Sequence, residues 1–270
     1  MHISFLDPYR PRPSLVHRLD ARVKLVLTLA FILATALAPI GVWPVYILLW
    51  ALALVIEILS ELGLGYVLRR AALALPFVLA AVPVIFTTRG ADATPLAALS
   101  LGPWTLTATA AGIERFASIA LKSWLSAQVA IVLAASTSFP DLLLAMRGIR
   151  LPRLLVAIFG LMWRYLFVLA DEALRLIRAR AARSGVNNAQ DRGGGTVAWR
   201  ARVTGGMAGS LFLRAFERSD RIYAAMAARG YDGEVRALAL PPLTPPAWLV
   251  LGAGLTLLAL LTLLGFLLGG

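Results

Sequence analysis

Five long apolar segments constrain this chain more than any other feature of its sequence. Each approaches the roughly 17–25 apolar residues that a helix needs to cross a bilayer. With 60% hydrophobic residues and a mean hydropathy of +0.80, the chain is too apolar for an ordinary soluble domain. The sequence therefore predicts an all-α polytopic membrane protein, with spans near Val23–Ala38, Val42–Leu59, Ala71–Phe86, Phe116–Ala135 and Ala247–Leu268.

The distribution of charge predicts the orientation of these spans. Basic residues gather between Arg10 and Lys24, before the first span, and again at Arg69 and Arg70, after the second. The connection around Thr87–Gly112 is nearly neutral. Because loops rich in Lys and Arg stay on the cytoplasmic side, we expect a multi-pass protein of the cell membrane with a cytoplasmic N-terminus.

A sixth apolar segment, Leu151–Ala170, differs because it contains Arg153 and Arg164. If it crossed the bilayer, the arginine-rich stretch from Arg175 to Arg236 would lie outside, against the positive-inside rule. We therefore predict that this segment is part of a long amphipathic helix that stays on the cytoplasmic side.

These assignments give three regions. Residues 1–135 form a four-helix membrane region, residues 136–240 a cytoplasmic coupling domain of amphipathic helices, and residues 241–270 the last transmembrane helix. Within the cytoplasmic domain the pattern predicts a short helix at Asp141–Arg147, which Ser138 is placed to cap. Longer helices are predicted at Pro152–Ala182 and Trp199–Ala228.

The two longer cytoplasmic helices end alike. "LIRARAARSG" ends in Ala182-Arg183-Ser184, and "RIYAAMAARGYDG" ends in Ala228-Arg229-Gly230. A single such end has an ordinary explanation, since helices often stop at Gly and an arginine in the last turn suits the helix dipole. Two of them on one side of a membrane suggest a part that docks onto a two-fold partner.

Several kinds of chemistry are not indicated. The chain has no Cys, and its two His residues lie near the N-terminus, so no metal site is predicted. It has no Walker A motif and no catalytic constellation within the spans, so we predict a non-enzymatic protein without a cofactor. Although the net charge is +12, the sequence has no motif that reads the groove of a nucleic acid. No nucleic-acid partner is therefore expected.

A few polar residues fall at unusual positions. Lys122 lies within a span. Its ammonium either extends to the membrane surface, pairs with a neighbour such as Glu114, or has a role in the function of the protein. Glu57, near the cytoplasmic end of its span, is expected to pair with a basic residue. Arg164, Glu172 and Lys122 are candidates for a polar network. Alternatively, Arg164 and Glu172 lie on the solvent-exposed face of an amphipathic helix.

Several stretches resemble one known family. "SLVHRLDARVKL", "TSFPDLLLAMRGIRLPRLL" and "FERSDRIYAAMAARGYDGEVRAL" are similar to the transmembrane T component of energy-coupling factor (ECF) transporters, the CbiQ-like family. The Ala-Arg-Gly-type helix ends are its hallmark, and the first of them departs here because Ser184 replaces Gly. The resemblance covers most of the chain.

The resemblance implies a function and partners. Such a T component binds two ABC-type ATPase subunits and a separate substrate-binding (S) membrane subunit, and transmits ATP-driven motion between them. By this resemblance Arg183 and Arg229 dock the ATPases, with Ala182, Ser184, Ala228 and Gly230 as small neighbours. The implied substrate is a cobalt or nickel ion; a shared T component for vitamin uptake, a conventional ABC permease and a structural scaffold remain alternatives.

Overall fold

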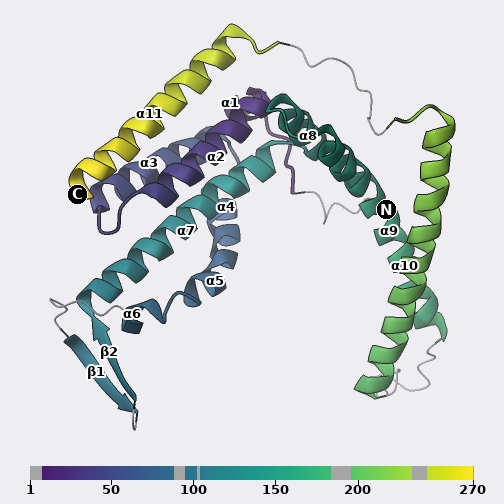
Figure 1. Ribbon diagram of the computed structural model, residues 1–270, viewed down its shortest axis with the longest axis horizontal. Coiled ribbons are helices and arrows are strands. Elements are labelled where there is room, and N and C mark those ends of the chain that lie inside the picture. The colour runs from purple at the N-terminus through teal and green to yellow at the C-terminus, as the bar shows by residue number, and fades with distance from the viewer. Residues whose placement is uncertain (1–7, 88–94, 102–103, 184–195, 233–241, 270) are drawn as a thin grey trace. The chain divides into compact units, whose positions relative to one another are not determined.

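The computed structural model describes residues 8–87, 95–101, 104–183, 196–232 and 242–269. Its described residues are mostly helical, in agreement with the predicted fold class, and the chain is a helical membrane protein (Figure 1). Contacts divide the chain into two units, one containing the two longest helices, α9 (Arg153–Arg183) and α10 (Val197–Ala228), and the other containing the remaining elements. Three described helices are long and apolar enough to cross a membrane, α7 (Ala110–Ser136), α9 and α11 (Pro245–Gly269).

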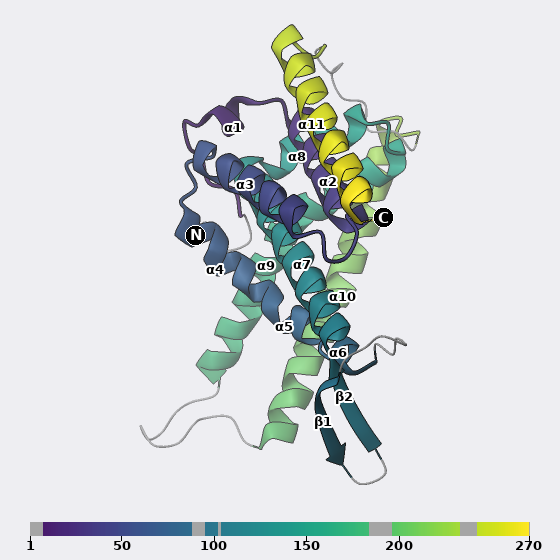
Figure 2. The same cartoon turned by 90° about the vertical axis from the view of Figure 1, so that its left-hand side faces the viewer.

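Four helices form the bundle of the larger unit. After the short α1 (Leu15–Arg18), these are α2 (Ala21–Leu37), α3 (Trp43–Leu59), α7 and α11. Both α7 and α11 pack against α2 and against α3, and the two views show α11 beside α2 and α3 (Figure 2). Buried residues from all four helices make one apolar cluster, including Phe31, Leu49, Leu125, Val129 and Leu258. The bounds of these helices agree closely with the predicted spans.

The third predicted span, Ala71–Phe86, is not a continuous helix. The structure breaks this region into α4 (Leu64–Ala71), a 3-10 turn (η1, Ala72–Ala74), α5 (Leu75–Leu79) and α6 (Val84–Thr87). Pro76 and Pro83 explain the interruption, because proline lacks the backbone N–H and its ring clashes with the preceding helical turn. The expectation of one uninterrupted helix here was wrong.

A two-stranded antiparallel hairpin follows, of β1 (Pro95–Leu101) and β2 (Trp104–Thr109). It lies within the neutral connection for which no strand was predicted. Thr109 then caps α7 by accepting a hydrogen bond from the backbone N–H of Gly112 at 3.1 Å. At Gly112 the backbone of α7 comes against Ile85 of α6, and a side chain there would collide with the Ile85 carbonyl.

Two lysines tie α2 to α7. The Nζ of Lys24, in the first turn of α2, donates to the carbonyl of Ser136 at the end of α7 (2.9 Å). The Nζ of Lys122, in the middle of α7, donates to the carbonyl of Ala38 at the end of α2 and contacts that of Ala36 at 3.4 Å. The two helices are therefore antiparallel. The short helix α8 (Phe139–Gly148) also packs against α2 and begins with the predicted Ser138 cap.

Candidate functional site

The two predicted docking ends belong to one antiparallel pair of helices. Along this pair Glu172 of α9 accepts from Arg214 (3.3 Å) and pairs with Arg218 (3.6 Å) of α10. Arg180, near the end of α9, donates to Thr204 near the start of α10 at 3.2 Å. The end of α9 therefore lies beside the start of α10.

This arrangement places the two motif arginines at opposite ends of the pair. Arg183 is the last residue of α9 and is exposed, beside the N-terminal end of α10. Arg229 follows the last residue of α10 and is also exposed. Because α10 has 32 residues at about 1.5 Å per residue, the two arginines are separated by roughly 48 Å along the pair.

The backbone after α10 holds Arg229 in a defined position. Tyr231 N–H donates to the carbonyl of Met226, and Gly230 N–H donates to that of Ala227, both at 3.0 Å. These two bonds make a Schellman motif, which requires a left-handed residue just after the helix. Gly230 supplies it with φ of +80°, a conformation that other residues rarely adopt.

The remaining predicted docking residues are small. Ala182 and Ala228 are exposed on the last turns of α9 and α10. Ser184 lies outside the described residues.

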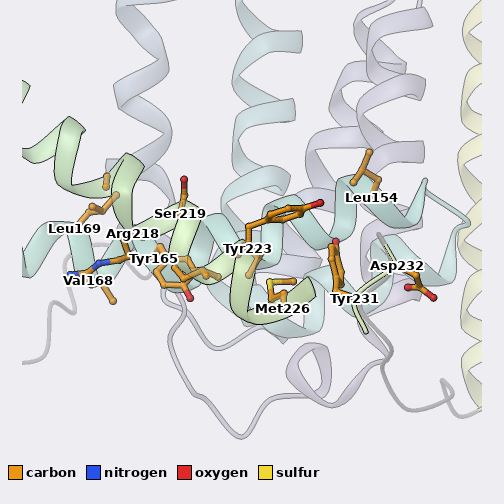
Figure 3. Close-up of a pocket in the computed structure, with 13 residues that line it drawn as sticks. Leu154, Tyr165, Val168, Leu169, Arg218, Ser219, Tyr223, Met226, Tyr231 and Asp232 are labelled. Carbon is orange, nitrogen blue, oxygen red and sulfur yellow. The ribbon is translucent and has the colours of Figure 1, made fainter. Parts of the chain in front are cut away.

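A groove lies between the two helices toward the Arg229 end (Figure 3). It encloses about 630 Å³, within the range of roughly 300–1,000 Å³ typical of ligand sites. In Figure 3 the side chains of Tyr223, Met226 and Tyr231 lie close together at one part of the groove, with Leu154 of α9 nearby. Most of its lining is apolar, and Arg218 and Asp232 add charge.

Both helices of the pair leave large apolar side chains uncovered. On α9, Leu154, Ile158 and Met162 are exposed. On α10, Phe212, Leu213, Phe216 and Tyr223 are exposed, with Phe212 at 69%. Contiguous exposed apolar surface of this kind marks an interaction site for protein or membrane.

The candidate network of Arg164, Glu172 and Lys122 has a different composition in the structure. Glu172 pairs with Arg214 and Arg218, and Arg164 lies 5.9 Å from the ring of its neighbour Tyr165. Lys122 bonds the carbonyls at the end of α2, and its Nζ is 5.8 Å from the centre of the Tyr46 ring. Lys122 belongs to the other unit, and no hydrogen bond or ion pair joins Arg164 to Glu172 in the described part of the chain.

Glu57 is the polar residue whose surroundings differ most from expectation. Its side chain is 2% exposed on α3, and neither carboxylate oxygen has a hydrogen-bond partner among the described residues. The prediction that it pairs with a basic residue was wrong.

Within the same described ranges, no group of three or more His, Cys, Asp or Glu residues is arranged to hold a metal ion.

Comparison with known proteins shows the family of the chain over most of its length. The family model described as "Cobalt transport protein", CbiQ, matches residues 13–238. The chain belongs to the CbiQ family. A cobalt transport protein CbiQ from Rhodobacter capsulatus is 32% identical over 189 residues, which cover 70% of this chain and 72% of the relative.

Other relatives are named EcfT instead of CbiQ. The energy-coupling factor transporter transmembrane protein EcfT of Brevibacillus brevis is 30% identical over 88% of this chain and 89% of its own. The EcfT of Lacticaseibacillus paracasei is 28% identical over 84% of this chain and 85% of its own. The family recognised in the sequence, the T components of ECF transporters, is therefore confirmed, and the CbiQ-family chain is a membrane component of a transporter.

Sequence reasoning missed the ion pairs of Glu172 with Arg214 and Arg218, and it missed the groove. Glu172 and Arg214 are separated by 42 residues, and only the antiparallel packing of α9 on α10 brings them together. The spacing of Arg214 and Arg218, one helical turn apart on one face, was the available signal.

Proposed function

We propose that this chain couples two ABC-type ATPase subunits to a separate substrate-binding membrane subunit in an ECF importer of cobalt or nickel ions. ATP hydrolysis takes place on the partner subunits, and this chain transmits their motion. The observation that carries the proposal is the placement of two exposed arginines at opposite ends of one antiparallel helix pair.

The separation of roughly 48 Å favours two partner subunits over one. A single interface of standard size covers about 800 Å² on each partner, a patch about 30 Å across, so one subunit would not ordinarily span both ends. Each arginine can form a bidentate pair with a carboxylate on its own ATPase subunit. The flanking alanines leave room for each helix end to enter a groove of the partner.

The pair of helices α9 and α10 is proposed to lie on the cytoplasmic side. Taken by itself, without α10, α9 is long and apolar enough to cross a membrane. Because α10 packs along α9, a bilayer-crossing α9 would bring Arg214, Arg218 and Glu172 of the pair into the hydrocarbon layer. The exposed apolar residues of the pair are proposed to be covered by the S subunit and by the membrane interface.

The test is assembly and uptake in Arg183→Glu, Arg229→Glu and the double variant, all as full-length chains with their partner subunits. Loss of one partner of a buried charge pair costs about 2–5 kcal/mol, so each single variant should weaken ATPase binding at least about tenfold. The double variant should lose ATPase binding and ATP-driven uptake of labelled cobalt.

Arg69→Glu is the control, because Arg69 is an exposed arginine of α4 in the other unit and belongs to neither of the two helix ends. It should bind ATPases and transport normally. Wild-type ATPase binding by the double variant would refute the docking role.

A second substrate class is a vitamin delivered through a shared T component. Two relatives named EcfT match over 84–88% of this chain. For this reason the shared T component is retained as an alternative to a cobalt or nickel transporter. Uptake assays with labelled cobalt, nickel and vitamins in a host lacking its own transporters distinguish the two.

A further inference from the structure

The four-helix bundle contains a half-open cavity that the proposed function does not use. Helices α2 and α3 each pack against α7 and against α11, and the cavity lies between these helices. The cavity measures about 400 Å³ and is lined by residues of all four helices and by Val16 and Leu19 beside α1. Its volume falls within the range of roughly 300–1,000 Å³ for small-molecule sites.

The cavity has a polar end and an apolar remainder. The first turn of α2, the last turns of α3 and α7, and the beginning of α11 meet at one end, where Lys24, Leu59, Ser136 and Val250 line it. Two helical turns further along α2, about 10 Å away, the lining reaches Phe31. The other lining side chains are apolar except for Thr28, so the interior suits a hydrocarbon chain.

Two polar groups at the polar end have unused hydrogen-bonding capacity. The Lys24 side chain, only 8% exposed, donates one hydrogen bond, to the Ser136 carbonyl, although an ammonium carries three donors. The hydroxyl of Ser136 is buried and has no partner among the described residues. A buried cation and a buried hydroxyl beside an apolar space are arranged to meet an anion that carries an apolar tail.

The acids near Lys24 have other partners. Asp20 and Asp141 are close enough to act on its charge, but neither forms a salt bridge with it in the described structure. Asp20 accepts from the backbone N–H of Arg22 at 2.8 Å and lies 3.7 Å from its Nε. Asp141 accepts from the Ser138 hydroxyl at 2.6 Å. Among the described residues no acid pairs with Lys24, and beside its bond to the Ser136 carbonyl its ammonium keeps two donors for a ligand.

We propose that this cavity binds one anionic phospholipid, with an acyl chain between the four helices and its phosphate on Lys24 and Ser136. Lysine binds phosphate as a compact point charge. The polar end belongs to the side predicted to be cytoplasmic, where anionic lipids attract basic residues close to the membrane. The proposal concerns the membrane bundle alone and does not depend on the docking role of Arg183 and Arg229.

The experiment is native mass spectrometry of the full-length chain, delipidated in mild detergent and titrated separately with phosphatidylglycerol, phosphatidylcholine and inorganic phosphate. Phosphatidylglycerol should bind at one site, at least about tenfold more tightly than phosphatidylcholine, because both lipids present a phosphate but the choline cation of the second repels Lys24. Inorganic phosphate should not compete, because it lacks the acyl chain. Equal retention of the two lipids, or displacement by inorganic phosphate, overturns the proposal.

Variants then locate the site. Lys24→Met should weaken phosphatidylglycerol binding about tenfold, whereas Lys24→Arg should retain it. Lys122→Met is the matched control, because Lys122 is the only other lysine of the chain and does not line the cavity. Wild-type lipid binding by a folded Lys24→Met chain overturns the proposal, and so does an equal loss in Lys122→Met.

A cavity-filling variant tests the acyl-chain part of the site. Ala253 lines the cavity from α11, and Ala253→Phe should occupy part of its volume and reduce lipid retention while leaving the polar end intact. The helical content by circular dichroism should equal that of the wild type. Unchanged retention in the folded variant, or recovery of a peptide or second copy of the chain from the site, contradicts a lipid occupant.

Discussion

Lys24 and Lys122, the chain's two lysines, bind opposite ends of the same antiparallel helix pair. Lys24 of α2 donates to the last residue of α7, and Lys122 of α7 donates to the carbonyl just after the last residue of α2. Each cation thus meets the negative end of the partner helix and satisfies carbonyls that the helix itself leaves free. A lysine in a span therefore has a structural explanation here.

This relationship predicts the effect of Lys122→Met. The variant removes a charged hydrogen bond to the end of α2, which contributes about 1–3 kcal/mol. The melting temperature of the chain in detergent should fall by several degrees, and ATPase binding should persist because α9 and α10 are unchanged. Lys122→Arg should recover most of the loss. An unchanged melting temperature for the methionine variant would mean that Lys122 merely snorkels.

For Glu57 we expect substitution to raise the melting temperature, in contrast to Lys122. A buried carboxylate without a partner is destabilising, and removal of the charge relieves the cost of its desolvation. Glu57→Gln, and more so Glu57→Met, should therefore raise the melting temperature. If Glu57 instead paired with a basic residue, as its position in the sequence suggested, both substitutions should lower it by leaving a cation unpaired. Thermal unfolding followed by tryptophan fluorescence separates the two cases.

His17 predicts how the N-terminal segment responds to pH. Its Nδ1 lies 2.6 Å from Ser14 Oγ and its Nε2 lies 2.9 Å from the Arg10 carbonyl, and partial burial lowers the pKa of His17 from its ordinary value of 6.5. The unfolded chain therefore binds more protons near pH 6, so this contribution to stability is present above pH 6.5 and is lost as the pH falls below it. His17→Asn should flatten the dependence of the melting temperature on pH between 7.5 and 5.

Labelling of introduced cysteines tests the orientation of the helix pair. The chain has no native Cys, so Arg202→Cys on α10 and Leu268→Cys near the end of α11 each give one reactive site. We expect a membrane-impermeant maleimide to label position 268 in intact cells and position 202 only after the membrane is opened. Labelling of position 202 from outside would show that α9 crosses the membrane.

The sequence predicted the long helices well because their apolar patterns are local. Predicted Trp199–Ala228 and observed Val197–Ala228 differ by two residues at one end. The break at Pro83 was missed because its neighbours are all apolar and hydropathy does not register a lost N–H. The strands were missed as well, although "WTLTAT" alternates threonine with other residues as strands do.

The site was predicted less completely than the fold. Arg183 and Arg229 could be singled out from the sequence because the motif is contained in the helix ends, and their docking role stays a prediction. Their placement at opposite ends of one pair required knowledge of how α9 packs on α10. The partner of Lys122 lies 84 residues away and is a backbone carbonyl, which no residue pattern reveals.

The last prediction separates the geometry of the second docking end from its charge. Gly230 has φ of +80° and open space around the position of a side chain, so a substitution there strains the backbone without causing a collision. Gly230→Val should disrupt the Schellman motif and move Arg229, with a cost of roughly 1–2 kcal/mol at the helix end. ATPase binding and ATP-driven uptake should fall although every arginine is present.

The control for this variant is Gly230→Asn, since asparagine tolerates the left-handed conformation and should retain most of the activity. Gly63→Val is the matched backbone control. Gly63 has φ of +84° and also has open space, but it lies before α4 in the other unit. It should lower the melting temperature without weakening ATPase binding. If Gly230→Val binds ATPases as tightly as the wild type, the fixed position of Arg229 is irrelevant to docking, and only its charge matters.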